Sequence, residues 1–287
     1  MSTQTAPPSA STPGAPATDE PAQLTLPGAR RSGSPSRVLY GAAGIALALL
    51  AWQLYSYLRN DPILVPRVET VAQTFWEYMT ARYPATVGMT LWQHALVSIA
   101  RITVGWGVGV LLGVVIGGLM ASVPLLRHLI DPLIEITRPL PPLAFIPLFI
   151  LWFGIGEISK FLLILVGVVP IMIIATVSAL DAVPKELEQA ARSLGASPTW
   201  TLVTVRLRSA LPAIITGMHL AMGGAWTSIV AVELIAATAG LGYLINNAGV
   251  NLQTPLVLSG IVTISIVGIV FDSLLRLLHR RIDPTRR

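Results

Sequence analysis

The sequence predicts an all-α integral membrane protein with six transmembrane helices, and its composition and the spacing of its charges support that prediction. Of its 287 residues, 53% are apolar and only 11% are charged, with a mean hydropathy of +0.70. Soluble domains carry about a quarter charged residues, so a soluble enzyme is excluded. Stretches without Asp, Glu, Lys or Arg are long enough to cross the roughly 30 Å hydrocarbon layer as helices. They cover 38–58, 102–126, 161–180, 209–232 and 234–271.

Residues 1–36 have a different composition from the rest of the chain. They hold seven prolines and eleven Ser or Thr residues, with almost no bulky apolar side chain. Such a segment buries too little surface to offset the entropy of ordering it. We therefore expect a disordered tail over 1–36, a membrane domain over 37–282 and a second short tail over 283–287.

Hydropathy and turn residues divide the membrane domain into six expected spans. Between the first two, apolar residues over 68–79 recur at helical spacing, which is typical of an amphipathic helix at the membrane surface. Four prolines over 139–147 remove amide donors and predict a break in the third span. Broken backbone at membrane depth is tolerated only inside protein or along a cavity. The expected spans are 38–58, 93–121, 129–153, 159–182, 210–237 and 257–278.

The second expected span carries a glycine at every fourth position, Gly105, Gly109, Gly113 and Gly117. Glycines at this interval form a smooth groove on one helix face, where another backbone can approach closely. The groove is explained either by an interface between subunits or by packing within the same chain.

The distribution of Lys and Arg predicts the orientation in the membrane. If both termini lie on one side, the segments on that side hold 13 of the 19 Lys and Arg residues and the opposite segments hold four. Basic residues accumulate on the cytoplasmic side, so both termini are expected there. The net charge of +5 has the same origin in this interpretation, and no nucleic-acid partner is expected.

The longest cytoplasmic loop in this topology, 183–209, has the signals of two short helices joined by a bend. Pro184 suits a helix start, and acidic residues in the first turns favour the positive end of the helix dipole. Gly195 fits the left-handed position after the first helix, and Ser197 followed by Pro198 suits the start of the second. The loop is built either to dock a partner or as a plain amphipathic connector.

This loop resembles the EAA loop of permease subunits of binding-protein-dependent ABC importers. The resemblance rests on Glu188–Ala191, Gly195 and Leu211–Pro212, and it extends from about Val38 to the end of the chain. Segments 143–160, 217–235 and 240–245 are similar to the nitrate/sulfonate/taurine branch of that family. Gln189 replaces the glutamate usual before the two alanines. The resemblance implies a type I ABC importer permease fold, with an ATPase-coupling loop at Glu188, Gln189, Ala190, Ala191, Gly195 and Ala196.

The resemblance also implies a function and partners. We expect a non-catalytic transport subunit in the cell inner membrane that forms the pathway for a small anion such as alkanesulfonate, taurine or nitrate. Its expected partners are a second permease subunit in a homodimer, two cytoplasmic ABC ATPase subunits and an extracytoplasmic substrate-binding protein. Alternatives are a permease for a pyrimidine thiamine precursor or a flavin and, from another class, an ion-coupled secondary transporter.

Three polar residues inside the expected spans are candidates for the pathway or its gate, because ionisable groups are costly inside a bilayer. We expect Arg101 and Glu233 to pair, or to flank the pathway, near the outer gate; a purely structural pair is the alternative. His219 either meets an anionic substrate or is satisfied by packing. Glu135 and Arg138 are expected at the inner start of the third span, where a helix pair or snorkelling to the interface explains them.

The sequence offers no site for metal, nucleotide or covalent catalysis. It contains no cysteine, and its four histidines lack ligand spacing. Neither of its two lysines, Lys160 and Lys185, completes the phosphate-binding GxxxxGK[ST] pattern. No cofactor is therefore expected on this chain, and ATP and Mg²⁺ are expected on the partner ATPase.

Overall fold

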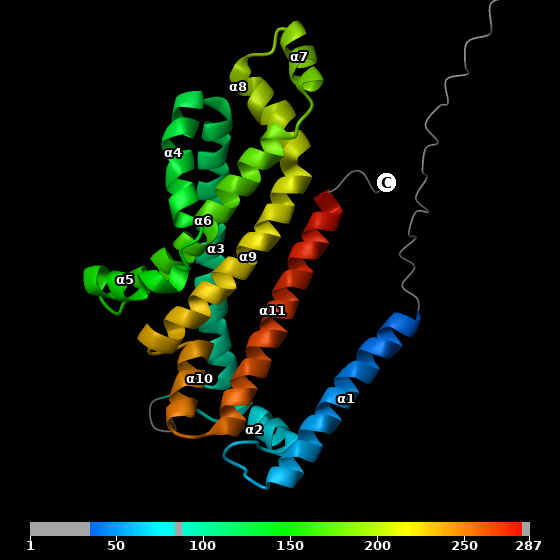
Figure 1. Cartoon of the computed structure of the whole chain (residues 1–287), viewed down its shortest axis with the longest axis vertical. Coiled ribbons are helices and arrows are strands. Elements are labelled where there is room, and N and C mark those ends of the chain that lie inside the picture. The colour runs from blue at the N-terminus through cyan, green and yellow to red at the C-terminus, as the bar shows by residue number, and fades with distance from the viewer. Residues whose placement is uncertain (1–34, 84–87, 283–287) are drawn as a thin grey trace, which may run out of the picture. The chain divides into compact units, whose positions relative to one another are not determined.

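The computed structural model describes residues 35–83 and 88–282. The tails expected over 1–36 and 283–287 lie outside these residues, except that Pro35 and Ser36 begin a helix. Regular structure in the described ranges is helical apart from one β-bridge between Tyr83 and Met89 (Figure 1). The helices are α1 (Pro35–Arg59), α2 (Val68–Thr80), α3 (Leu91–Ser122), α4 (Pro124–Thr137), the 3₁₀ turn η1 (Pro142–Phe145), α5 (Ile146–Phe153), α6 (Glu157–Asp181), α7 (Lys185–Ser193), α8 (Pro198–Trp200), the π-helical turn η2 (Thr201–Arg206), α9 (Leu207–Ala236), α10 (Leu241–Val250) and α11 (Thr254–Ile282).

The chain consists of two units, Met1–Ala48 and Leu49–Arg287, and α1 runs through the boundary. In the first unit the structure describes the beginning of α1 from Pro35. All packing and all sites described below belong to the second unit.

Five helices of the described residues are long and apolar enough to cross a membrane: α1 from Leu39, α3, α6, the run Pro198–Ala236, and α11. A sixth crossing is formed if α4 and the pair η1–α5 count as one broken span. This confirms the predicted all-α membrane fold. The segment Val68–Thr80 is helical, as its amphipathic pattern predicted.

The glycines of α3 are explained by packing within the chain. A Cβ added at Gly105 would lie 2.8 Å from Ile164, and one added at Gly109 would lie 2.6 Å from Val168. Added Cβ atoms at Gly113 and Gly117 would overlap α6 in the same way. Of the two explanations open from the sequence, contact with α6 of the same chain is therefore the one observed, and it brings the two helix backbones close together.

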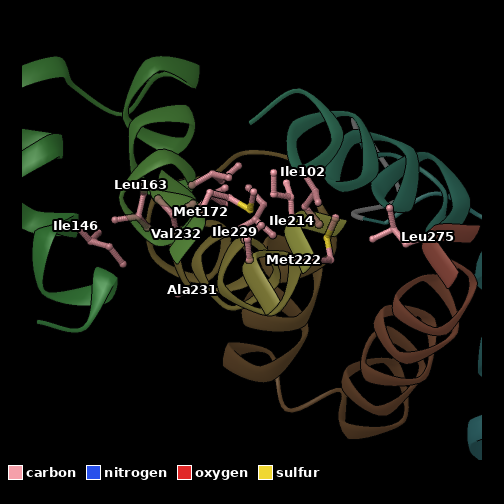
Figure 2. Packing of buried hydrophobic residues seen from close by; sticks show 14 of the residues in the cluster. Ile102, Ile146, Leu163, Met172, Ile214, Met222, Ile229, Ala231, Val232 and Leu275 are labelled. Atoms are coloured by element: carbon pink, nitrogen blue, oxygen red, sulfur yellow. The ribbon is translucent and has the colours of Figure 1, made fainter. Parts of the chain in front are cut away.

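The largest apolar cluster lies where α3, α6 and α9 meet (Figure 2). Ile102, Met172 and Ile229 are completely buried in it. Ile146 of α5 and Leu275 of α11 attach the neighbouring helices to the same cluster. These three long helices therefore form the frame that positions everything else.

The predicted break in the third span is present. α4 ends at Thr137, and α4 and the pair η1–α5 are bent by 92° across the break. Pro139, Pro141 and Pro142 follow Thr137 closely, and none of them has an N–H group to continue the helix. Figure 1 shows α5 projecting sideways from the frame.

The contact between α3 and α6 can be tested by adding one methyl group. A Cβ at Gly113 would overlap Met172 and lie 3.2 Å from the carbonyl oxygen of Val169, and that backbone cannot move aside. We expect Gly113→Ala to lower the free energy of unfolding by about 1–3 kcal/mol. Gly107→Ala is the matched control, because nothing lies within 4 Å of its added Cβ. Thermal unfolding in detergent checks this, and equal melting temperatures for the two variants would contradict it.

Candidate functional site

The residues singled out from the sequence lie mainly in two groups at opposite ends of α6. The first group is near Glu157, where α6 begins, and the second is the 183–209 loop, which follows Asp181 at its other end. Figure 1 shows α10 and α7 at these two ends of the frame.

The first group is the Arg101 network, made of His94, Ser98, Arg101, Glu157 and Glu233. Arg101 Nη1 donates to Glu233 Oε1 at 2.9 Å, and its Nε and Nη2 donate to the Glu157 carboxylate at 2.7 and 2.6 Å. Arg101 also donates to the carbonyl oxygen of Ala239 at 2.6 Å. The predicted pairing of Arg101 with Glu233 is confirmed, whereas its place at a gate stays a prediction.

The same network holds the first turn of α10. The backbone N–H of Gly240 donates to His94 Nδ1 at 3.1 Å, that of Leu241 to Ser98 Oγ at 2.9 Å, and that of Gly242 to Glu233 Oε2 at 3.1 Å. Amide donors at a helix start have no partner within the helix. Side chains of α3 and α9 supply these partners, and the negative charge of Glu233 is favourable at the positive end of the helix.

Gly240 is needed for this arrangement. Its φ is +120°, in the region that favours glycine. A Cβ at this position would also overlap the carboxylate of Glu233. The connection between α9 and α10 therefore approaches the network more closely than a side chain would allow.

Burial distinguishes the two carboxylates that Arg101 contacts. The side chain of Glu233 is 1% exposed, whereas that of Glu157 is 65% exposed and also binds Lys160 Nζ at 3.0 Å. The sequence analysis identified Arg101 and Glu233 but missed their partners. His94, Ser98 and Arg101 are spaced i, i+4 and i+7, which places them on one face of α3 and is the signal that would have revealed the network.

His219 is not part of this network. It lies 14 residues before Glu233 on α9, about four helical turns away. Its Nδ1 lies 2.9 Å from the carbonyl oxygen of Ile215 on the same helix. Among the described residues, no three His, Cys, Asp or Glu side chains are grouped so that they could hold a metal ion.

In the second group, the bend of the 183–209 loop is the predicted one. α7 ends at Ser193, and Gly195 has a φ of +84°. The Ala196 N–H donates to Ala191 O at 3.1 Å and the Gly195 N–H to Arg192 O at 2.9 Å. This pair of bonds is the Schellman motif, which satisfies the last carbonyls of a helix and requires a left-handed residue.

The second part of the loop differs from the prediction of a separate short helix. Ser197 does accept a hydrogen bond from the Trp200 N–H, at 3.3 Å, as expected for a helix start. From Pro198, however, the chain is helical without interruption to Ala236, through η2 into α9. No helix-ending residue separates η2 from α9, and Pro212 is accommodated inside α9.

The loop presents apolar side chains together with charged ones. Leu194 is 89% exposed, and Leu187, Trp200 and Val203 are also exposed. Within the EAA-like segment, Gln189 and Ala190 are exposed, Ala191 is buried, and Glu188 accepts a hydrogen bond from Arg192 at 2.5 Å. Exposed apolar groups on a loop outside the spans are typical of a protein-binding surface.

Two arginines connect the base of this loop with the frame. The guanidinium of Arg206 donates to Leu180 O at 3.3 Å and to Ala121 O at 3.5 Å, at the ends of α6 and α3. Arg127 of α4 lies 2.9 Å from the Asp181 carboxylate at the end of α6. Arg206 therefore links the loop directly to α3 and α6, and Arg127 links α4 to the end of α6 that the loop follows.

The chain is similar to known transport proteins over most of its length. Residues 109–284 match the model of the family described as "binding-protein-dependent transport system inner membrane component". The taurine transport system permease protein TauC of Escherichia coli (strain K12) is 38% identical over 84% of this chain and 87% of its own length. The aliphatic sulfonate permease SsuC of Bacillus subtilis (strain 168), a putative assignment in its name, is 34% identical over 93% of both chains.

Two further matches extend this result. The nitrate import permease protein NrtB of Synechococcus elongatus is 27% identical over 85% of this chain and 89% of its own length. Among solved structures, the inward-facing MetNI methionine ABC transporter matches 65% of this chain and 93% of its own chain, with a TM-score of 0.56 and 20% sequence identity. The structural match supports the fold alone.

The unequal burial of the two carboxylates predicts unequal effects of the same substitution. We expect Glu233→Gln to lower the free energy of unfolding by about 1.5–3 kcal/mol, because a buried hydrogen bond to a charged group is lost. Glu157→Gln should cost at most about 1 kcal/mol, since its ion pairs are exposed. Unfolding of the two variants in detergent measures the difference, and equal losses would show that burial does not set the strength of the network.

Proposed function

We propose, because the chain belongs to the family of inner membrane components of binding-protein-dependent transport systems, that it forms the translocation pathway of an ATP-driven importer for a small sulfonate such as taurine. As a family member, the chain is a multi-pass transport component of the inner membrane. The single observation that supports the sulfonate assignment is the 38% identity to a taurine permease over 84% of the chain. Sulfonate and nitrate, the cargoes named in its relatives, are both oxyanions.

The proposed assembly follows the family pattern. Two copies of this chain would surround the pathway with both termini in the cytoplasm, and a binding protein would deliver the substrate from the outer side. Two ATPase subunits would bind ATP and Mg²⁺ and dock on the 183–209 loops. In this assembly the chain carries out no catalytic step; it binds the partner subunits and changes conformation to open the pathway for the substrate.

We propose that the 183–209 loop couples conformational changes of the ATPase subunits to the membrane helices. Exposed Leu194 and Trp200 give a partner an apolar contact surface. The Schellman motif at Gly195 fixes the angle between α7 and the helix that follows. Because the helix continues without interruption from Pro198 into α9, and because Arg206 bonds to the ends of α3 and α6, a push on the loop is transmitted to the membrane helices. Alternating access would result when two such loops approach each other.

Uptake in reconstituted vesicles tests this function. The chain is purified with the ATPase and the binding protein encoded by its host and placed in proteoliposomes, and uptake of radiolabelled taurine, ethanesulfonate and nitrate is measured. We expect ATP-dependent uptake of the sulfonates that disappears when the ATPase lacks its phosphate-binding lysine. Uptake by this chain alone, driven by an ion gradient, would contradict the proposal and support a secondary transporter.

Gly195 tests the role of the bend. A Cβ there meets nothing within 4 Å, so a substitution acts through backbone strain and not through a clash. A β-branched residue at this φ costs about 1–2 kcal/mol, and we expect Gly195→Val to reduce uptake several-fold while membrane insertion stays unchanged. Gly195→Asn is the matched control, because asparagine tolerates the left-handed region. Equal uptake by the two variants would show that the bend at Gly195 is not needed to couple ATP hydrolysis to transport.

A further inference from the structure

Arg138 lies beside the second half of α6, within a candidate membrane span. It lines a cavity of about 330 Å³ together with Thr137, Pro142, Gly167, Pro170 and Leu220. Pro170 is the fourteenth of the 25 residues of α6, so the cavity lies near the middle of a helix long enough to cross the bilayer. The cavity places Arg138 beside the second half of α6, and its expected place at the inner start of the third span stays a prediction.

A second cavity meets the first one at Arg138. It has a volume of about 250 Å³ and is also lined by Ile174, as is the first. Its other lining residues include Ser178, near the loop end of α6, and the carboxyl groups of Asp131 and Glu135. Arg138 thus lies between two cavities. The first has a mainly apolar wall beside the middle of α6, and the second extends toward the 183–209 loop.

The charge of Arg138 is not neutralised within the described part of the chain. Its guanidinium takes part in no ion pair and no hydrogen bond there, although Glu135 is three residues away. Asp131 lies 3.6 Å from Arg127 instead. Arg101, by contrast, binds two carboxylates and a carbonyl oxygen. An arginine at the centre of a bilayer costs about 2.5–3.5 kcal/mol on insertion scales, so a position of this kind needs a functional reason.

The surroundings of Arg138 are exposed in the isolated chain. No residue of α4 is buried, and Thr137 to Pro141 are exposed. Lipid cannot satisfy a broken backbone, so such a segment at membrane depth must face protein or a water-filled cavity. In a permease, the cavity that meets this requirement is the substrate pathway.

We propose that Arg138 is the cationic contact for the oxyanion group of the substrate at the middle of the pathway. A guanidinium presents parallel N–H donors that match two oxygens of a sulfonate or a nitrate. The wall of the 330 Å³ cavity is mainly apolar, so an anion there finds few polar contacts other than the guanidinium of Arg138. This inference rests on the proposed function and names the residue that meets the anion.

The first experiment compares Arg138→Gln, Arg138→Lys and Arg276→Gln in the complete reconstituted transporter. We expect Arg138→Gln to reduce uptake of taurine, ethanesulfonate or nitrate, whichever the wild type carries, by about tenfold or more. Arg138→Lys should keep a larger share, because it keeps the charge. Arg276→Gln should transport normally, since that arginine is exposed on α11 and its partner among the described residues is Asp272 of the same helix. ATP hydrolysis stimulated by the loaded binding protein should persist in Arg138→Gln, which excludes a folding defect.

The second experiment uses the absence of cysteine from the chain. Uptake by Arg138→Cys is measured before and after reaction with 2-aminoethyl methanethiosulfonate, which adds a cation, or with the 2-sulfonatoethyl reagent, which adds an anion. We expect the cationic reagent to restore uptake several-fold and the anionic reagent to leave it low. Leu133→Cys, on the exposed face of α4, should respond to neither reagent. Wild-type transporter treated with each reagent corrects for thiols on the partner subunits.

The outcomes separate this inference from the proposed function. If the wild type carries none of the three anions, both are overturned. If it carries one of them and Arg138→Gln carries it equally well, only the role of Arg138 is overturned. The role is overturned as well if both reagents restore Arg138→Cys to the same extent, because charge then has no effect at this position.

Discussion

The close approach of α3 and α6 is the contact on which the other features depend. The glycines at positions 105, 109, 113 and 117 let α3 and α6 approach closely, and a side chain at any of these four positions would overlap α6. This contact places Arg101 of α3 opposite Glu157 of α6 at one end of the frame. At the other end, Ala121 and Leu180 present neighbouring carbonyl groups that Arg206 binds together. Because the helices cannot slide without losing the glycine contacts, the two ends keep a fixed spacing.

Two helix breaks next to the frame differ in how their polar groups are bound. Between α9 and α10, each of the first three amide donors finds a buried side-chain acceptor, and the connection is sealed by protein of the same chain. Between α4 and η1, three prolines have no N–H group, while the N–H groups of Arg138 and Leu140 donate to Ile134 O and Thr137 O. The guanidinium of Arg138 has no partner among the described residues. The first break is therefore held by buried side chains of the same chain, whereas the second carries a charged group that the described residues do not bind.

Much of this arrangement was predictable from local sequence patterns. Charge-free stretches predicted the membrane helices, the glycine interval predicted a close helix contact, and Gly195 with Ser197 predicted the bend. Each of these features depends on residues close together in the sequence. The sequence did not decide whether the glycine face of the second span contacts another subunit or the same chain, because that depends on which helix packs against it in the folded protein. The continuity of η2 with α9 was missed because the sequence analysis ended the loop at residue 209, whereas the helix that begins at Pro198 runs on to Ala236. The prolines predicted a break in the third span, but not the bend of 92°, which is a property of the folded chain.

The two arginines of the spans show how one residue type serves two purposes. Arg101 is surrounded by acceptors, including a carboxylate that is 1% exposed, so its charge is fully used in holding α3, α6, α9 and the connection to α10 together. Such a group has no remaining attraction for a passing anion. Arg138 has the opposite properties, because its guanidinium has no partner among the described residues and it lines two cavities within a candidate membrane span. A charge held in that way is unfavourable in an empty bilayer and becomes favourable only when an anion or water reaches it. The structure thus separates the arginine that stabilises the fold from the arginine that is available to the cargo.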